Sequence, residues 1–141
     1  MAARKRSFVC LEKKLVKFHP QGKLAPGLGA KPMVSYFVRY RGSAANPSAF
    51  VAHYRDRHAA ILRGLPHIQS LVLHTPVAFR DPFPVQEGGT ALLAQMMFEN
   101  VAALDAALQS EARKKARDDF ARFGAFEGEI THEALSAEAI F

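Results

Sequence analysis

An imidazole inside an apolar helical stripe is the feature of the sequence that most directly suggests chemistry. His58 follows Phe50 and Tyr54 at intervals of four residues, so a helix would place all three side chains on one face. The unperturbed pKa of histidine, about 6.5, suits the residue to proton transfer near neutral pH. A shielded His58 beside a phenol could therefore remove a proton next to a carbonyl group or protonate a leaving oxygen.

The sequence leaves two interpretations of His58 open. A general acid or base needs partial shielding from water and a second polar group, and Tyr54 or Tyr36 would supply a phenol that orients the substrate. A structural histidine would instead hydrogen-bond a backbone carbonyl and fix the helix, because buried polar groups usually find partners. Phe50 is expected in the core in either case.

The other histidines and the single cysteine do not suggest a metal or cofactor site. In a regular α-helix His53 lies about 140° around the axis from His58, which is not the spacing of helical metal ligands. His67 and His74 are an odd number of residues apart, so a regular strand places them on opposite faces. Cys10 is the one cysteine, and the sequence has no glycine-rich nucleotide-binding motif and no nucleophile elbow. We expect neither a metal ion nor a cofactor.

Composition excludes several classes of protein. The chain has 141 residues, of which 49% are hydrophobic and 23% are charged, values that are typical of one folded domain. No apolar run approaches the roughly 20 residues that cross a bilayer, and the N-terminus lacks the apolar core of a secretory signal. We expect a soluble, cytoplasmic protein with no membrane partner.

The net charge of +6 is concentrated at the N-terminus. Residues 1–32 carry eight Lys or Arg and one Glu, a net charge of +7 that leaves −1 for the rest of the chain. Residues 19–32 are rich in proline and glycine and have no regular period, which is typical of a linker. We therefore expect a flexible basic extension over 1–32, no nucleic-acid partner, and a folded domain over 33–141. Met33 is an alternative natural start.

Six elements are predicted, in the order strand, helix, strand, strand, helix, strand. Asn46 and Pro47 mark the start of the helix that carries His58. Strands are predicted over 34–40, 67–75, 90–98 and about 126–135, and helical segments after Asn100 and Ser110. This order is the split βαβ arrangement of a ferredoxin-like α+β fold with a four-stranded antiparallel sheet. The basic cluster in the last helical segment, Arg113, Lys114, Lys115 and Arg117, is interpreted as a solvated helix face.

The helices of such a fold cover one face of the sheet and leave the other face open. Large exposed apolar patches mark association surfaces, so we expect a homodimer joined sheet to sheet. The loop between the second and third strands contains Phe79 and Phe83, and it is long enough either to close over a substrate or to pack against the partner subunit.

These motifs resemble those of the EthD family, within the dimeric α/β-barrel superfamily. The resemblance rests on Tyr36-Phe37-Val38, on Asn46-Pro47-xx-Phe50-xxx-Tyr54-xxx-His58-Ala59-xx-Leu62-xx-Leu65-Pro66, and on Met97-Phe98-Glu99-Asn100-Val101-Ala102-Ala103-Leu104. It spans about residues 33–135 and leaves the basic extension outside. Its most specific element is the row of two aromatic residues and a histidine that Leu65-Pro66 closes.

The resemblance implies a ferredoxin-like protomer, a dimer whose sheets form a barrel, and a pocket between sheet and helices with His58 at its wall. Relatives include methylmuconolactone isomerases and polyketide cyclases or dehydratases, which move protons on small oxygenated or aromatic compounds without a cofactor. The founding EthD protein accompanies a cytochrome system that degrades ethers. This chain has Pro66-His67 where many relatives have Pro-Gly, so His67 alters one corner of the expected pocket.

We therefore expect a cofactor-independent isomerase, cyclase or dehydratase that acts on a small carbonyl-containing or aromatic metabolite. His58 would be the general acid/base, and Tyr54, Tyr36 and His67 would bind the substrate. The alternative is a noncatalytic small-molecule binding or accessory protein of an oxidative degradation pathway. A third interpretation is a dimeric scaffold in which His58 is structural.

Overall fold

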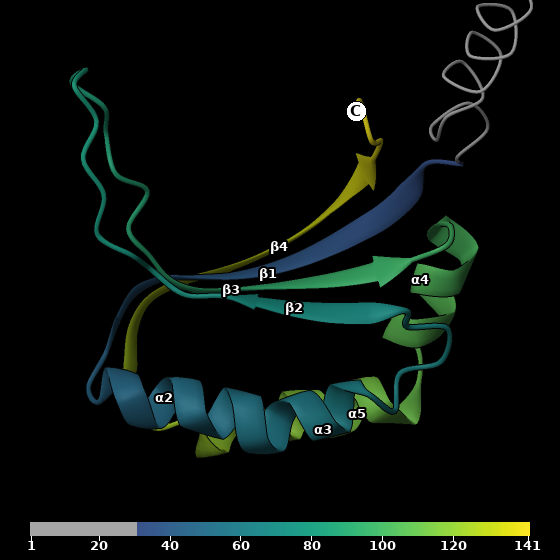
Figure 1. The fold of residues 1–141 in the computed structure, drawn as a ribbon. Coiled ribbons are helices and arrows are strands. Elements are labelled where there is room, and N and C mark those ends of the chain that lie inside the picture. The colour runs from purple at the N-terminus through teal and green to yellow at the C-terminus, as the bar shows by residue number, and fades with distance from the viewer. Residues whose placement is uncertain (1–30) are drawn as a thin grey trace, which may run out of the picture. The chain divides into compact units, whose positions relative to one another are not determined.

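The computed structural model describes residues 31–141, and all but the last two residues of the expected basic extension lie outside them. The elements follow the predicted order of a ferredoxin-like α+β fold (Figure 1). They are β1 (Met33–Ala44), α2 (Pro47–His53), a π-helical segment (Tyr54–His58), α3 (Ala59–Leu62), β2 (Ser70–His74), β3 (Thr90–Phe98), α4 (Val101–Leu108), α5 (Glu111–Asp119), a 3-10 turn (Phe120–Arg122) and β4 (Phe126–Ala137).

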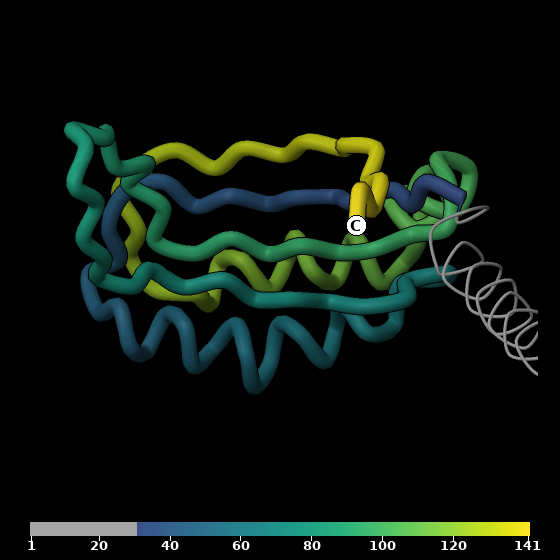
Figure 2. Tube along the Cα trace, turned by 45° about the horizontal axis from the view of Figure 1, so that its top comes forward, coloured from purple at the N-terminus to yellow at the C-terminus, as the bar shows by residue number. Residues whose placement is uncertain are grey.

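The four strands form one antiparallel sheet in the order β2-β3-β1-β4. Figure 2 shows the strands side by side in this order, and Figure 1 shows α2, α3 and α5 along one face of the sheet. Side chains alternate along β1 as the sequence predicts, so Val34, Tyr36, Val38 and Tyr40 are buried toward the helices. The opposite face, which no helix covers in the part of the chain that the structure describes, is the open face of the sheet.

Side-chain caps begin three of the helices where the sequence predicts them. The Asn46 side chain accepts a hydrogen bond from the Ala49 amide at 3.1 Å, and Pro47 occupies the first turn of α2. Asn100 begins α4 in the same way, and Ser110 begins α5. Each cap satisfies an amide that the helix itself leaves without an acceptor.

Aromatic rings hold the start of α2 against the sheet and against the C-terminal part of the chain. Phe50 is buried, as expected, and its ring centroid lies 5.4 Å from Tyr40, 5.3 Å from Phe123 and 5.4 Å from Phe126. Rings at these separations pack favourably in tilted or offset geometries. This cluster fixes the helix that carries His58 relative to β1 and to the end of α5.

Two glycines face each other where β1 and β4 bend toward α2. Gly42 pairs with Gly128, with φ angles of 138° and 145° that L side chains rarely adopt. A β-carbon on either residue would collide with the backbone of the opposite strand. Glycine at both positions lets the strands approach and bend (Figure 1), and the bend carries Phe126 onto Phe50.

Two predictions about the middle of the chain need correction. The second strand does not begin at His67 but at Ser70, because the chain turns after the helix and His67 adopts a φ of 66° in that turn. The loop that follows β2 projects away from the sheet (Figure 1), and Phe79 and Phe83 are 58% and 74% exposed. No described helix combines the length and the apolarity needed to cross a membrane.

Candidate functional site

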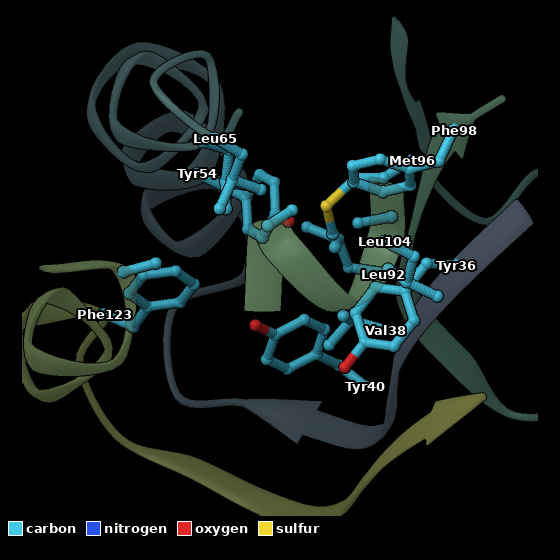
Figure 3. Close-up of a cluster of buried hydrophobic side chains, with 14 of the residues drawn as sticks. Tyr36, Val38, Tyr40, Tyr54, Leu65, Leu92, Met96, Phe98, Leu104 and Phe123 are labelled. Atoms are coloured by element: carbon cyan, nitrogen blue, oxygen red, sulfur yellow. The ribbon is translucent and has the colours of Figure 1, made fainter. Parts of the chain in front are cut away.

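A cavity of about 250 Å³ lies between the sheet and the helices. The apolar part of its wall comes from the core. Figure 3 shows Tyr54 of the π-helical segment and Leu65, just after α3, opposite Tyr36, Val38 and Tyr40 of β1. The polar side chains that line it are Tyr36, Tyr40, Tyr54, His58, Arg113, Arg117 and His132. The cavity therefore combines an apolar interior with groups that can donate hydrogen bonds or exchange protons.

His58 is held at the cavity wall by a carboxylate. Its side chain is almost completely buried, and its Nδ1 lies 2.9 Å from Oδ2 of Asp119. Every fully buried polar side-chain atom of residues 31–141 has a hydrogen-bond partner, whereas Nε2 of His58 has none among them. Nε2 is therefore not completely buried. Because His58 lines the cavity, we infer that Nε2 faces it.

Asp119 is a buried carboxylate that two histidines share. Its Oδ2 accepts hydrogen bonds from His58 and, at 3.0 Å, from Nε2 of His53, while Arg122 approaches Oδ1 at 3.9 Å. The Phe123 ring packs against both imidazoles, with centroids 4.7 Å from His58 and 4.9 Å from His53. Phe123 thus helps to keep water away from the shared carboxylate.

The protonation states of this pair suit His58 to the role of a base. Burial lowers the pKa of His58 more than the hydrogen bond to Asp119 raises it. Burial would raise the pKa of Asp119, but hydrogen bonds from His58 and His53 outweigh it and hold that pKa below its usual value. At neutral pH the ionised carboxylate can only accept, so Nδ1–H of neutral His58 donates to it. The lone pair of His58 is then on Nε2, facing the cavity.

The prediction that His53 and His58 point apart is wrong, because the helix is not regular there. The Ala59 amide bonds the carbonyl of Tyr54, five residues earlier, so Tyr54–His58 is π-helical. The extra residue in this turn narrows the angle between His53 and His58, and both reach Asp119. Such π-bulges occur frequently at functional sites.

These three side chains do not form a metal site. Both imidazoles direct a nitrogen at the same Asp119 oxygen, so the groups bond one another and do not surround an empty position. Within the described residues, no three His, Cys, Asp or Glu side chains are arranged to hold a metal ion.

Tyr36 and His132 form a second polar pair at the cavity. The Tyr36 hydroxyl lies 2.9 Å from Nδ1 of His132, across the β1–β4 pairing. Burial raises the pKa of Tyr36, and the nearby Arg113 offsets part of this effect. Burial lowers the pKa of His132, and Arg113 and Arg117 lower it further. The phenol and the imidazole that share this hydrogen bond are therefore both neutral at neutral pH.

Tyr54 and Tyr40 add two more phenols. Burial raises the pKa of each well above its ordinary value, so both remain neutral donors across the physiological pH range. The Tyr54 ring lies next to the His58 ring, with centroids 4.8 Å apart. Both tyrosines line the cavity, so a bound molecule could take a hydrogen bond from either hydroxyl.

The structure brings together three of the four residues for which the sequence predicts a site role. His58, Tyr54 and Tyr36 all line the cavity. His67 does not, because the turn after the helix carries its exposed side chain away from the cavity wall. Its expected role in substrate binding has no support from this placement.

Sequence reasoning missed Asp119, Tyr40, His132 and the two arginines of the cavity wall. Asp119 was overlooked because it lies in a run of charged residues, although the spacing of its neighbours indicated a buried helix face. Ala112, Ala116, Asp119 and Phe123 follow a helical spacing, and all four are buried or partly buried. A carboxylate within an apolar stripe indicates a buried partner. His132 had no such signal, since only the strand register brings it to Tyr36.

Several solved structures are similar to this protein in fold. An EthD family protein from Bacillus halodurans C-125 is similar over 72% of this chain and 95% of its own, with 22% identity and a TM-score of 0.58. A monooxygenase from Streptomyces coelicolor, in complex with the ligand nanaomycin D, is similar over 78% and 90%, with 14% identity and a TM-score of 0.54. SnoaB, a cofactor-independent oxygenase from Streptomyces nogalater, is similar over 77% and 96%, with 15% identity and a TM-score of 0.51.

The comparison of sequences is more specific. No curated protein matches this chain. The model of the EthD domain matches residues 43–127, which is more than half of the chain and includes His58, Asp119 and both arginines of the cavity. The chain therefore belongs to the EthD domain family.

Proposed function

We propose that this protein is an enzyme that moves a proton on a small carbonyl-containing or aromatic compound without a cofactor. One observation carries the proposal: His58 lines the cavity with Nε2 free of hydrogen bonds to the described residues, while its Nδ1 bonds the buried carboxylate of Asp119 at 2.9 Å. A carboxylate in this position fixes the ring and its tautomer, and it stabilises the imidazolium that forms when Nε2 accepts a proton. His58 is then the catalytic acid/base and Asp119 the positioning residue.

The proposed reaction begins at a carbon next to a carbonyl group. Nε2 of His58 accepts the proton, and the electron pair of the broken C–H bond moves onto the carbonyl oxygen to give an enolate. The imidazolium then returns a proton to a different atom of the substrate, or to an oxygen that leaves. Isomerisation, cyclisation and dehydration share this first step, so the class of reaction depends on where the proton is returned.

Other cavity residues fit the same chemistry. Tyr54, beside His58, can donate a hydrogen bond to the carbonyl oxygen as it becomes negative, and Tyr36 can bind a second oxygen of the substrate. A cavity of about 150 Å³ accommodates benzene. The larger cavity of this protein, about 250 Å³, suits a substituted or fused ring.

Deuterium exchange tests the proposal without knowledge of the natural substrate. The enolisable bicyclic ketone 2-tetralone and a derivative with a ring carboxylate would be incubated with the protein in deuterated buffer and followed by proton NMR. We expect the wild type to accelerate exchange next to the carbonyl, His58→Gln to abolish the acceleration, and Asp119→Asn to reduce it by about a hundredfold or more. Circular dichroism would check that the variants fold.

The outcome also separates the enzyme from the alternative, a small-molecule binding or accessory protein. If wild-type protein binds these probes but exchanges no protons in either of them, the enzyme proposal is overturned. If His58→Gln exchanges as fast as the wild type, His58 is not the base. A loss of folding in His58→Gln, with no exchange by the wild type, would instead support a structural histidine.

A second candidate reaction starts from the same proton removal. Two of the similar structures are described as a monooxygenase and a cofactor-independent oxygenase. A substrate anion formed at His58 could react with molecular oxygen, so that a CH₂ group becomes C=O and one molecule of water is released. Oxygen uptake with anthrone, an activated tricyclic ketone, distinguishes this reaction from proton transfer alone. Uptake that depends on His58 would support it.

A further inference from the structure

We propose that the cavity selects an anionic substrate, a small aromatic compound whose carboxylate or other negative group is held by Arg113 and Arg117. The inference rests on the proposed function and deepens it, because it names the class of compound that the same cavity binds. It is carried by the charged residues that line the cavity.

The cavity wall is cationic. Arg113 and Arg117 line it, and no Asp or Glu of residues 31–141 does. The acidic residues of β4 do not face it, because the strand alternates and directs Glu129 and Glu133 to the open face while Ile130 and His132 face the helices. A neutral aromatic ligand would need no such excess of positive charge.

Neither arginine is engaged in an ion pair within the part of the chain that the structure describes. The ion pairs there involve Asp119 with its two histidines and Arg122, and Lys114 with Glu111 on α5. Arginine at a cavity wall usually meets a carboxylate or phosphate, which its planar guanidinium binds through two hydrogen bonds. Here no carboxylate among residues 31–141 takes that position, which is left for a ligand.

The spacing of the two arginines reinforces the inference. Arg113 and Arg117 are four residues apart on α5, so their like charges lie on one helix face and repel each other. Arg113 is partly buried, and its positive charge lowers the pKa values of Tyr36, Tyr40, Tyr54, His58 and His132, against the larger effect of burial on the tyrosines. Arg117 is exposed, so a ligand anion beside both guanidinium groups would relieve this repulsion mainly at the partly buried Arg113, where water screens charge less.

The arrangement also suggests how a substrate would be oriented. The positive charges of Arg113 and Arg117 both lower the pKa values of Tyr36 and His132. Of the two arginines, only Arg113 lowers the pKa of His58. The anionic group would bind at the end of the cavity near Tyr36 and Arg117, with the ring between the aromatic walls and the reacting carbon toward His58. The positive charge of Arg113 would then also stabilise an enolate formed there.

A matched pair of ligands tests the charge requirement. The probes are 2-naphthoate and 2-naphthamide, which have nearly the same shape but differ by one negative charge, and their affinity would be measured by titration calorimetry at low salt. We expect wild-type protein to bind the naphthoate at least about tenfold more tightly than the amide. Arg113→Gln/Arg117→Gln should lose this preference while binding of the amide changes little.

A second double variant controls for net charge. Arg55→Gln/Arg63→Gln removes two positive charges from residues that do not line this cavity, and it should keep the preference for naphthoate. The proposal is overturned if the wild type binds both probes equally, or if the control loses the preference to the same extent as the cavity variant. Because the measurement is of binding, His58→Gln should retain the preference, so failure of the proposed catalysis would not be mistaken for failure of this inference.

Discussion

His58 and Asp119 are 61 residues apart in the chain, yet Nδ1 of the one lies 2.9 Å from Oδ2 of the other, and both side chains are buried. The contact joins the π-helical segment to the last residue of α5. It links the stability of the fold to the protonation of the site, because neither group can change its charge without disturbing the other.

This linkage predicts that acid destabilises the protein before its carboxylates are protonated. Folding lowers the pKa of His58 from 6.5, so the unfolded chain binds the proton more readily. The contribution of His58 is fully present above about pH 6.5 and is lost as the pH falls through its folded pKa. We expect the free energy of unfolding, measured in urea, to fall from about pH 7.5 to about pH 5. His58→Gln should flatten this dependence, and His132, whose pKa is also lowered, should leave a residual slope.

His53 is predicted to control the pKa of His58 through the carboxylate that they share. In His53→Leu, Asp119 loses one donor and His58 loses a repulsive neighbour, so the pKa of His58 should rise. His53→Gln retains an N–H donor and should give an intermediate value. NMR titration of the imidazole nitrogens measures this directly. His74→Leu, which removes an exposed histidine bonded to Gln95, is the control. An unchanged titration of His58 in His53→Leu would contradict the prediction.

The two site tyrosines should respond differently to loss of the hydroxyl. Tyr36→Phe removes the hydrogen bond to His132 and should cost about 0.5–1.5 kcal/mol of stability. Tyr54→Phe removes a hydroxyl that lines the cavity and has no hydrogen-bond partner among the described residues, so it should cost less. Both should slow deuterium exchange into 2-tetralone. A larger stability loss in Tyr54→Phe than in Tyr36→Phe would argue against the ligand-facing role of the Tyr54 hydroxyl.

The open face of the sheet is predicted to bind a second copy of the chain. Val72 of β2 and Leu135 of β4 are 44% and 48% exposed, and alternation places both on this face. We expect sedimentation to give a dimer for the wild type, and a monomer for Val72→Glu/Leu135→Glu at the same concentration. Val101→Glu, at an exposed position of α4 and outside the strands, should remain dimeric. A monomeric wild type would remove the basis for this expectation.

Local patterns were sufficient to predict most of the fold. The alternation of β1, the capping residues Asn46 and Asn100 and the stripe that includes Phe50 each depend on a few neighbouring residues, and the structure confirms them. The start of β2 was predicted too early, because the residues after Leu65 have the composition of a strand whereas the helix end requires a turn through His67.

The site was harder to predict because two of its relationships are not local. Tyr36 meets His132 only because β1 pairs with β4 in one register. Asp119 meets His58 only because the end of α5 packs beside the π-helical segment that carries His58. The sequence did place His58 at the wall of a pocket, through its stripe and through the family resemblance. It did not predict the companion carboxylate, and a regular helix was the wrong assumption for His53.

The π-helical segment is equivalent to one inserted residue in an otherwise continuous helix. A relative that lacks this residue would show a single-position gap between the counterparts of Tyr54 and His58 when the two sequences are aligned. In such a protein the counterparts of His53 and His58 would be four residues apart in a regular α-helix, about 40° around the axis, and could still share one carboxylate. A relative that keeps the five-residue spacing but has a regular α-helix would instead place the two histidines about 140° apart and could not build the two-histidine arrangement.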